Sequence, residues 1–191
     1  AWGRIDTLAP ALLNSLGLAV AASLLATGIV LLMVVLNDKG KRPLLRLAIY
    51  APLLVPQVSL VLGLQAVLVW FWLDGTWLAM LWIHALFICP FAYLIIAPAA
   101  AAMDRRYIAV AASLGAGPGS RYLRVALPML APAITTALFV GVSVSVALYL
   151  PSLFAGGGRI TTVTLEAVAL ASGGSRQMAG VAAMLQLAIP L

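Results

Sequence analysis

Residues 104–128 read DRRYIAVAASLGAGPGSRYLRVALP and lie between long apolar runs. The segment predicts two short helices joined at a glycine turn. The first is expected to end at Leu114, where a Gly-Ala-Gly run follows, because glycine reaches left-handed backbone angles at little cost. Pro118 suits the first turn of a second helix, which is expected to run towards Leu127. We name this bent segment the elbow.

The rest of the chain is strongly apolar. Of 191 residues, 64% are hydrophobic and only 8% are charged, whereas a soluble domain of this length needs far more polar surface. A helix crosses the apolar core of a bilayer with about 20 residues. Stretches without Asp, Glu, Lys or Arg cover 7–37, 47–73, 75–103 and 125–158, and a fifth begins at Gln177. The sequence therefore predicts an all-α, polytopic helical membrane protein with about five transmembrane helices, the last one truncated.

The distribution of basic residues predicts the topology. The net charge is +6, but most cations fall in two connectors, as Lys39, Lys41, Arg42, Arg46, Arg105, Arg106, Arg121 and Arg124. The other side of the membrane would carry Arg4, Arg159 and Arg176. Cytoplasmic loops are enriched in Lys and Arg. We therefore expect connectors 37–46 and 101–127 in the cytoplasm and the N-terminus outside, and the basicity does not indicate nucleic-acid binding.

Prolines and small residues refine the predicted spans. The first is expected over 11–36 after Pro10, the second over 47–70 as one helix kinked by Pro52 and Pro56, the third over 77–97, and the fourth from Pro128 to about residue 150. Small residues that let helices approach closely recur every four positions as Ser15, Ala19, Ser23 and Thr27, and again as Ala133, Ala137, Gly141 and Ser145. Both stripes are predicted to pack against other helices.

Few polar residues lie at membrane depth. Gln57 and Glu166 are candidates for the translocation path, although a glutamine in a span commonly bonds another helix and an acid commonly stabilises a helix surface. Glu166 belongs to a short helix expected over 161–172, within an outer loop of about 151–176. His84 is expected to be neutral and hydrogen-bonded, with a proton relay as the alternative.

The chain offers little chemistry of its own. It has one histidine, one cysteine and five scattered acids, and the glycine run at 115–119 is not followed by the Lys-Ser/Thr of a phosphate loop. We expect no catalytic site, no metal site and no cofactor in this chain. The sequence begins without a start residue and stops 14 residues after Gln177, so it is expected to be a fragment cut at both ends.

The elbow resembles the "EAA" loop of permease subunits in binding-protein-dependent ABC importers. That pattern is Glu-Ala-Ala, three residues, Gly, nine residues, Ile, one residue, Leu-Pro. The matching positions are Ala111, Gly115, Val125 in place of Ile, Leu127 and Pro128, and the sequence departs from the pattern at Ala109 and Val110. The resemblance implies an ATPase-contacting coupling loop that includes Ala109, Ala111, Leu114, Gly115, Ala116, Val125, Leu127 and Pro128.

The resemblance also implies the rest of the machine. The chain would be a single permease domain over 1–191, with a type I ABC importer core, in a bacterial inner membrane. A second permease half, cytoplasmic ABC ATPase subunits and an extracytoplasmic substrate-binding protein would be its partners. The outer loop resembles permeases of the thiamine, ferric-iron and sulfate group, some of which fuse two halves, and this chain resembles a second half. An ion-coupled secondary transporter or channel without an ATPase, and a passive scaffold, are the alternatives. The sequence names no cargo.

Overall fold

The computed structural model describes residues 5–36, 43–173 and 176–189, and these residues form helices joined by turns, with no strand among them. The helices in chain order are α1 (Ile5–Leu36), α2 (Pro43–Leu54), α3 (Gln57–Trp70), α4 (Trp77–Ala102), α5 (Arg106–Ser113), α6 (Pro118–Arg121), the π-helix η2 (Tyr122–Ala126), α7 (Leu127–Ala147), α8 (Tyr149–Gly156), α9 (Val163–Ser172) and α10 (Arg176–Ala188). The prediction of an all-α fold is confirmed. The first connector's Lys39, Lys41 and Arg42, and also Arg4, lie outside the described residues.

Three helical segments are long and apolar enough to cross a membrane: Leu8–Val34, Trp77–Ala102 and Pro118–Ala147. A fourth crossing would come from the bent pair Arg46–Leu54 and Gln57–Trp70. Val163–Ser172 and Ala179–Ala188 are apolar but shorter. The protein is therefore a polytopic helical membrane protein, and the stretch expected to hold the truncated fifth span forms the short helix α10.

The second span is broken, where the sequence predicted one kinked helix over 47–70. Helices α2 and α3 meet at an angle of 113°. The break falls at Pro56, whose backbone is extended (φ −52°, ψ 127°). Proline has no N–H to continue the helix, and it drives the residue before it out of the helical region. Pro52, by contrast, is tolerated inside α2.

Two prolines that were predicted to open spans instead lie within continuous helical segments. Helix α1 begins at Ile5 and passes through Pro10. Pro128 lies inside the segment Pro118–Ala147, so the elbow's second half is a direct extension of α7 and not a separate short helix. The wide π-turn immediately before Pro128, in which the Leu127 N–H donates to the Tyr122 carbonyl, accommodates a residue that cannot donate.

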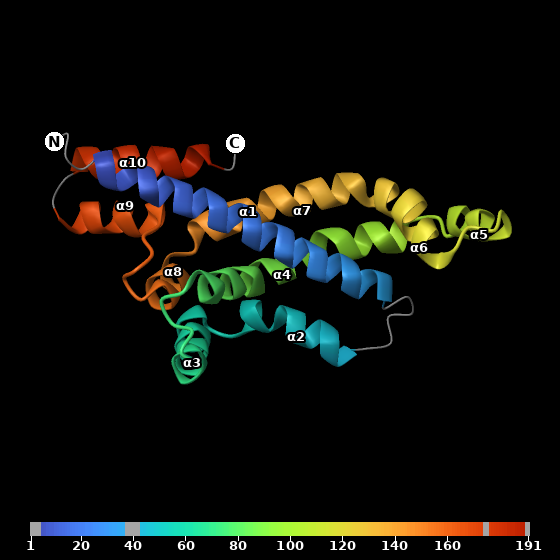
Figure 1. Ribbon diagram of the computed structural model, residues 1–191, viewed down its shortest axis with the longest axis horizontal. Coiled ribbons are helices and arrows are strands. Elements are labelled where there is room, and N and C mark those ends of the chain that lie inside the picture. The colour runs from blue at the N-terminus through green and yellow to red at the C-terminus, as the bar shows by residue number, and fades with distance from the viewer. Residues whose placement is uncertain (1–4, 37–42, 174–175, 190–191) are drawn as a thin grey trace.

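The core is the mutual packing of α1, α4 and α7 (Figure 1). The small residues predicted to face other helices are buried there: Ser15, Ala19, Ser23 and Thr27 on α1, and Ala137, Gly141 and Ser145 on α7. Only Ala133 of the second stripe remains half-buried. The packing role of both stripes is confirmed, and it holds the three long helices as one rigid unit.

Polar contacts tie the outer segments to this core. The backbone N–H of Val163, at the start of α9, donates to Ser15 Oγ at 2.8 Å, and the Asn14 side-chain amide donates to the Thr161 carbonyl at 3.1 Å. The turn before α4 is joined to α8 by the Gly75 N–H, which donates to the Ala155 carbonyl at 2.9 Å. These bonds hold α8 and α9 toward the end of the bundle where α1 begins (Figure 1).

The elbow projects from the opposite end of the molecule. In Figure 1, α5 and α6 lie toward one tip of the long axis, and α9 and the starts of α1 and α10 lie toward the other. This arrangement agrees with the predicted topology, in which the elbow is on the cytoplasmic side and the 151–176 segment is outside. The start of α1 and helix α9 therefore lie at the end of the molecule opposite the elbow, and which side of the membrane each end faces stays a prediction.

Candidate functional site

The elbow is built on a left-handed glycine. Gly115 has φ +80°, and it follows the last turn of α5. The Gly115 N–H donates to the Ala112 carbonyl and the Ala116 N–H donates to the Ala111 carbonyl, both at 3.0 Å. This reciprocal pair is the Schellman motif that ends helices at a left-handed residue. The predicted glycine break is confirmed, and it joins Ala111 and Ala116 of the predicted coupling loop.

A hydrogen-bonding side chain fixes the start of α5, and a proline fixes the start of α6. Asp104 Oδ1 accepts a hydrogen bond from the Arg106 N–H at 2.9 Å, which satisfies a donor at the start of α5. Pro118 stands in the first turn of α6, as predicted. The two arms are therefore fixed at both ends by local bonds, and α5 also contacts α6 and η2. The elbow has a defined shape of its own.

One face of α5 is apolar and uncovered. Leu114 is 82% exposed, Tyr107 58% and Val110 57%. Their spacing of three and four residues puts them on a single helical face. Of the predicted coupling residues, Leu114 belongs to this face; Tyr107 and Val110 also lie on it and were not among the predicted residues. The i, i+3, i+7 spacing from Tyr107 to Leu114 is the signal in the sequence that could have revealed them.

The remaining family-pattern positions surround this face without forming a buried site. Gly115 and Ala109 are exposed, whereas Ala111, Ala116 and Val125 are half-buried. Leu127 and Pro128 are exposed on the α7 extension. Apart from Ala109, which also lines a cavity beside the elbow, these side chains therefore lie on a surface, which suits contact with another protein.

The two candidates for the translocation path lie apart. Gln57 begins α3 and lines a cavity of about 600 Å³ beside the α2–α3 break, together with apolar groups such as Phe87 and Leu148. Glu166 lies in the first turn of α9 and does not line that cavity. An acid in the first turn of a helix is stabilised by the helix dipole. The structure therefore does not join Gln57 and Glu166 in one site.

His84 is buried and held at both ring nitrogens. Its Nδ1 lies 2.8 Å from Ser145 Oγ of α7, and its Nε2 lies 3.1 Å from Ser152 Oγ of α8. The Ser152 hydroxyl donates to the Leu148 carbonyl at 2.6 Å, so its oxygen can accept from an Nε2–H, whereas the direction of the bond between Nδ1 and Ser145 depends on the tautomer. The predicted hydrogen bonding of this histidine is confirmed, and its neutral state stays a prediction. No cluster of three metal-ligating side chains occurs in the described parts of the chain.

Comparison with known families shows to which protein family the chain belongs. Residues 19–191 match the family described as the binding-protein-dependent transport system inner membrane component. The chain belongs to this family. The resemblance inferred from the elbow is thereby confirmed, and so is the expectation of a multi-pass bacterial inner-membrane protein.

A curated relative of this chain is the inner membrane ABC transporter permease protein YnjC of Escherichia coli (strain K12). The two are 35% identical over 181 residues, which make up 95% of this chain. The chain spans about a third of the relative's length, since the aligned part is 35% of it. The similarity thus covers nearly the whole chain, from the helices of the core to the elbow.

Proposed function

We propose that this chain forms part of the translocation pathway of an ATP-driven, binding-protein-dependent importer, and that its elbow couples the pathway to a cytoplasmic ABC ATPase. Family membership supports the first part. The observation that carries the second is the uncovered apolar face of Tyr107, Val110 and Leu114 on a stiff helical corner. Such a face can fill a groove on a partner and transmit the partner's movement as a rigid-body motion.

The elbow's shape also explains why it suits mechanical coupling. Its glycine turn is closed by backbone bonds, and its second arm continues without interruption into the spanning helix α7. A displacement of α5 is therefore delivered to the membrane core through Pro118–Ala147. The exposed Ala109 stands where the family pattern has Glu, so the proposed contact relies on apolar packing more than on a carboxylate.

We propose that the transporter also contains a second permease half. The relative is about three times as long as the aligned region, which leaves room for a second permease half in one polypeptide, and we propose that this chain works with such a half.

We place the translocation path beside the α2–α3 break, where Gln57 is the polar group lining the cavity. Glu166, at the outer end, is proposed to lie near the mouth, where a substrate-binding protein would deliver cargo.

The test exchanges leucines of equal exposure. Leu114→Ser changes the proposed contact face, and Leu44→Ser changes a leucine at the start of α2 that is 80% exposed, outside the elbow. Burying a leucine contributes about 1.5–3 kcal/mol, so Leu114→Ser should weaken ATPase association tenfold or more in membranes that hold the assembled transporter. Leu44→Ser should leave it unchanged. Equal ATPase retention in both variants would refute the docking face.

A further inference from the structure

A second cavity, of about 800 Å³, lies between the membrane core and the elbow. Its walls come from the ends of α1, α2 and α4, from α5, and from the α6–η2 arm. The inferred cytoplasmic side of the molecule is where all these segments meet (Figure 1). With the elbow in the cytoplasm, as the charge distribution predicts, the cavity would lie at the level of the inner-leaflet headgroups, and it shares no lining residue with the Gln57 cavity.

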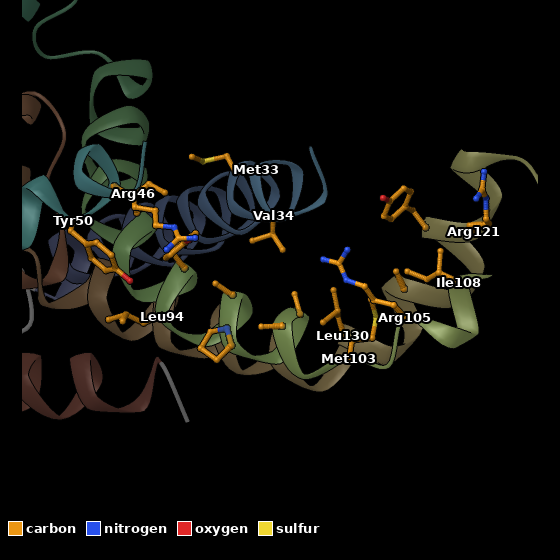
Figure 2. A pocket seen from close by; sticks show the side chains of 18 of the residues that line it. Met33, Val34, Arg46, Tyr50, Leu94, Met103, Arg105, Ile108, Arg121 and Leu130 are labelled. Atoms are coloured by element: carbon orange, nitrogen blue, oxygen red, sulfur yellow. The ribbon is translucent and has the colours of Figure 1, made fainter. Parts of the chain in front are cut away.

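The cavity is basic. Among the described residues that line it are three arginines, Arg46, Arg105 and Arg121, and no aspartate or glutamate. In Figure 2, the guanidinium groups of Arg46 and Arg105 extend from α2 and from the start of the elbow into the space beside Val34 at the end of α1. A guanidinium has five N–H donors in a planar fork, so an arginine that already has one partner still offers donors to a phosphate.

The rest of the lining is apolar and aromatic. Ile49 and Leu130 are almost fully buried beneath the cavity. Tyr50 and Tyr93 also line it, and their rings pack edge to face with centroids 5.8 Å apart. Tyrosine is enriched where lipid meets water. A cationic rim above apolar walls matches a molecule with an anionic head and a hydrocarbon tail.

We propose that this cavity binds an anionic phospholipid of the inner leaflet, with Arg46 and Arg105 as ligands of its headgroup from two sides of the cavity and Ile49 and Leu130 against an acyl chain. Basic pockets between membrane helices on the cytoplasmic side bind anionic headgroups in this way. The recognised chemistry is a phosphate anion, which a soluble phosphate could also supply. The apolar walls favour the lipid.

The experiment uses the full chain, assembled with its partners and purified into nanodiscs of phosphatidylcholine with or without phosphatidylglycerol. Native mass spectrometry counts retained phosphatidylglycerol. The variant Arg46→Gln/Arg105→Gln is compared with Arg106→Gln/Arg124→Gln, which removes the same charge from exposed arginines outside the cavity. A hydrogen bond to a charged group contributes about tenfold or more in affinity, so the cavity variant should bind roughly 100-fold more weakly, and the control should lose much less.

Each other outcome has a defined meaning. Equal lipid loss in the two double variants would overturn the proposal, because it would indicate general attraction of lipid to basic surface. Retention of lipid by the cavity variant would also overturn it, because the two arginines would then not be needed for binding. Inorganic phosphate, titrated into phosphatidylcholine nanodiscs, tests the soluble source: a thermal shift that requires Arg46 and Arg105, without retained phosphatidylglycerol, would overturn the lipid assignment. A melting temperature of the cavity variant equal to that of the control establishes that both are folded. None of these readings depends on ATPase docking.

Discussion

Gly141 on α7 packs directly against Ser23 on α1, whose hydroxyl donates a 2.8 Å hydrogen bond to the Leu138 carbonyl. A β-carbon added to Gly141 would overlap Ser23 Oγ and come within 3.0 Å of Ile88 Cγ2 on α4. The three long helices therefore meet at a position where only glycine fits. The hydrogen bond across α1 and α7 exists because the backbones approach so closely there.

Gly141→Leu should consequently disturb assembly. Overpacking of this kind costs on the order of 1–3 kcal/mol, and a bulky side chain would also break the Ser23 bond. The measurement is the melting temperature of the purified protein and its level in the membrane. Gly28→Ala is the control, because a β-carbon there meets nothing within 4 Å. An unchanged amount of folded Gly141→Leu protein would show that the close approach is dispensable.

The second prediction concerns the histidine that joins three helices. Ser145→Ala should destabilise the protein by about 1–3 kcal/mol, because it leaves the buried Nδ1 of His84 without its hydrogen-bond partner. Ser143→Ala is the matched control, since Ser143 is exposed and bonds only the Phe139 carbonyl of its own helix. Thermal unfolding of both variants checks this. If His84→Ala and Ser145→Ala add fully when combined, the bond between them contributes nothing.

The sequence predicted most of the bundle because lipid imposes simple rules. Apolar runs, the small-residue stripes and the turn at Gly115 each follow from one local requirement. The broken span did not follow, since Pro52 and Pro56 look alike in sequence and only packing determines that the chain turns by 113° at the second. Ser145 and Ser152, which bond the ring of His84, lie on helices far along the chain. No residue spacing in the sequence could reveal these partners. The face at Tyr107 and Val110 was visible in the spacing and was missed.

The third prediction tests the orientation of the chain. In a Cys89→Ala background, Ser113→Cys on the exposed surface of the elbow should resist membrane-impermeant thiol reagents applied to intact cells, and should react once the membrane is opened. Ser172→Cys, exposed at the end of α9, should react from outside in both conditions. The physical reason is the excess of basic residues in the cytoplasmic connectors. Labelling of Ser113→Cys in intact cells would reverse the topology.

The last prediction concerns two glycines of the elbow that differ only in backbone conformation. Gly115 has φ +80°, whereas Gly117 has φ −65° and ψ 161°. A β-carbon meets nothing within 4 Å at either position, so steric contact cannot distinguish them. A side chain at Gly115 costs about 1–2 kcal/mol because L-residues avoid left-handed angles. At Gly117 the same change is compatible with the extended backbone that precedes a proline.

Gly115→Val should therefore change the angle between α5 and α6 without affecting insertion of the spans, because the strain is confined to an exposed turn. The expected result is a normal amount of protein in the membrane, with a several-fold loss of retained ATPase or of ATP hydrolysis by the reconstituted complex. Gly117→Val, with the same side chain two residues away, should retain both. The two variants are compared by co-purification of the ATPase and by the rate of phosphate release. Because they differ only in whether the backbone is left-handed, normal coupling in Gly115→Val would mean that the angle of the elbow carries no signal, and α5 would then dock as a flexible peptide.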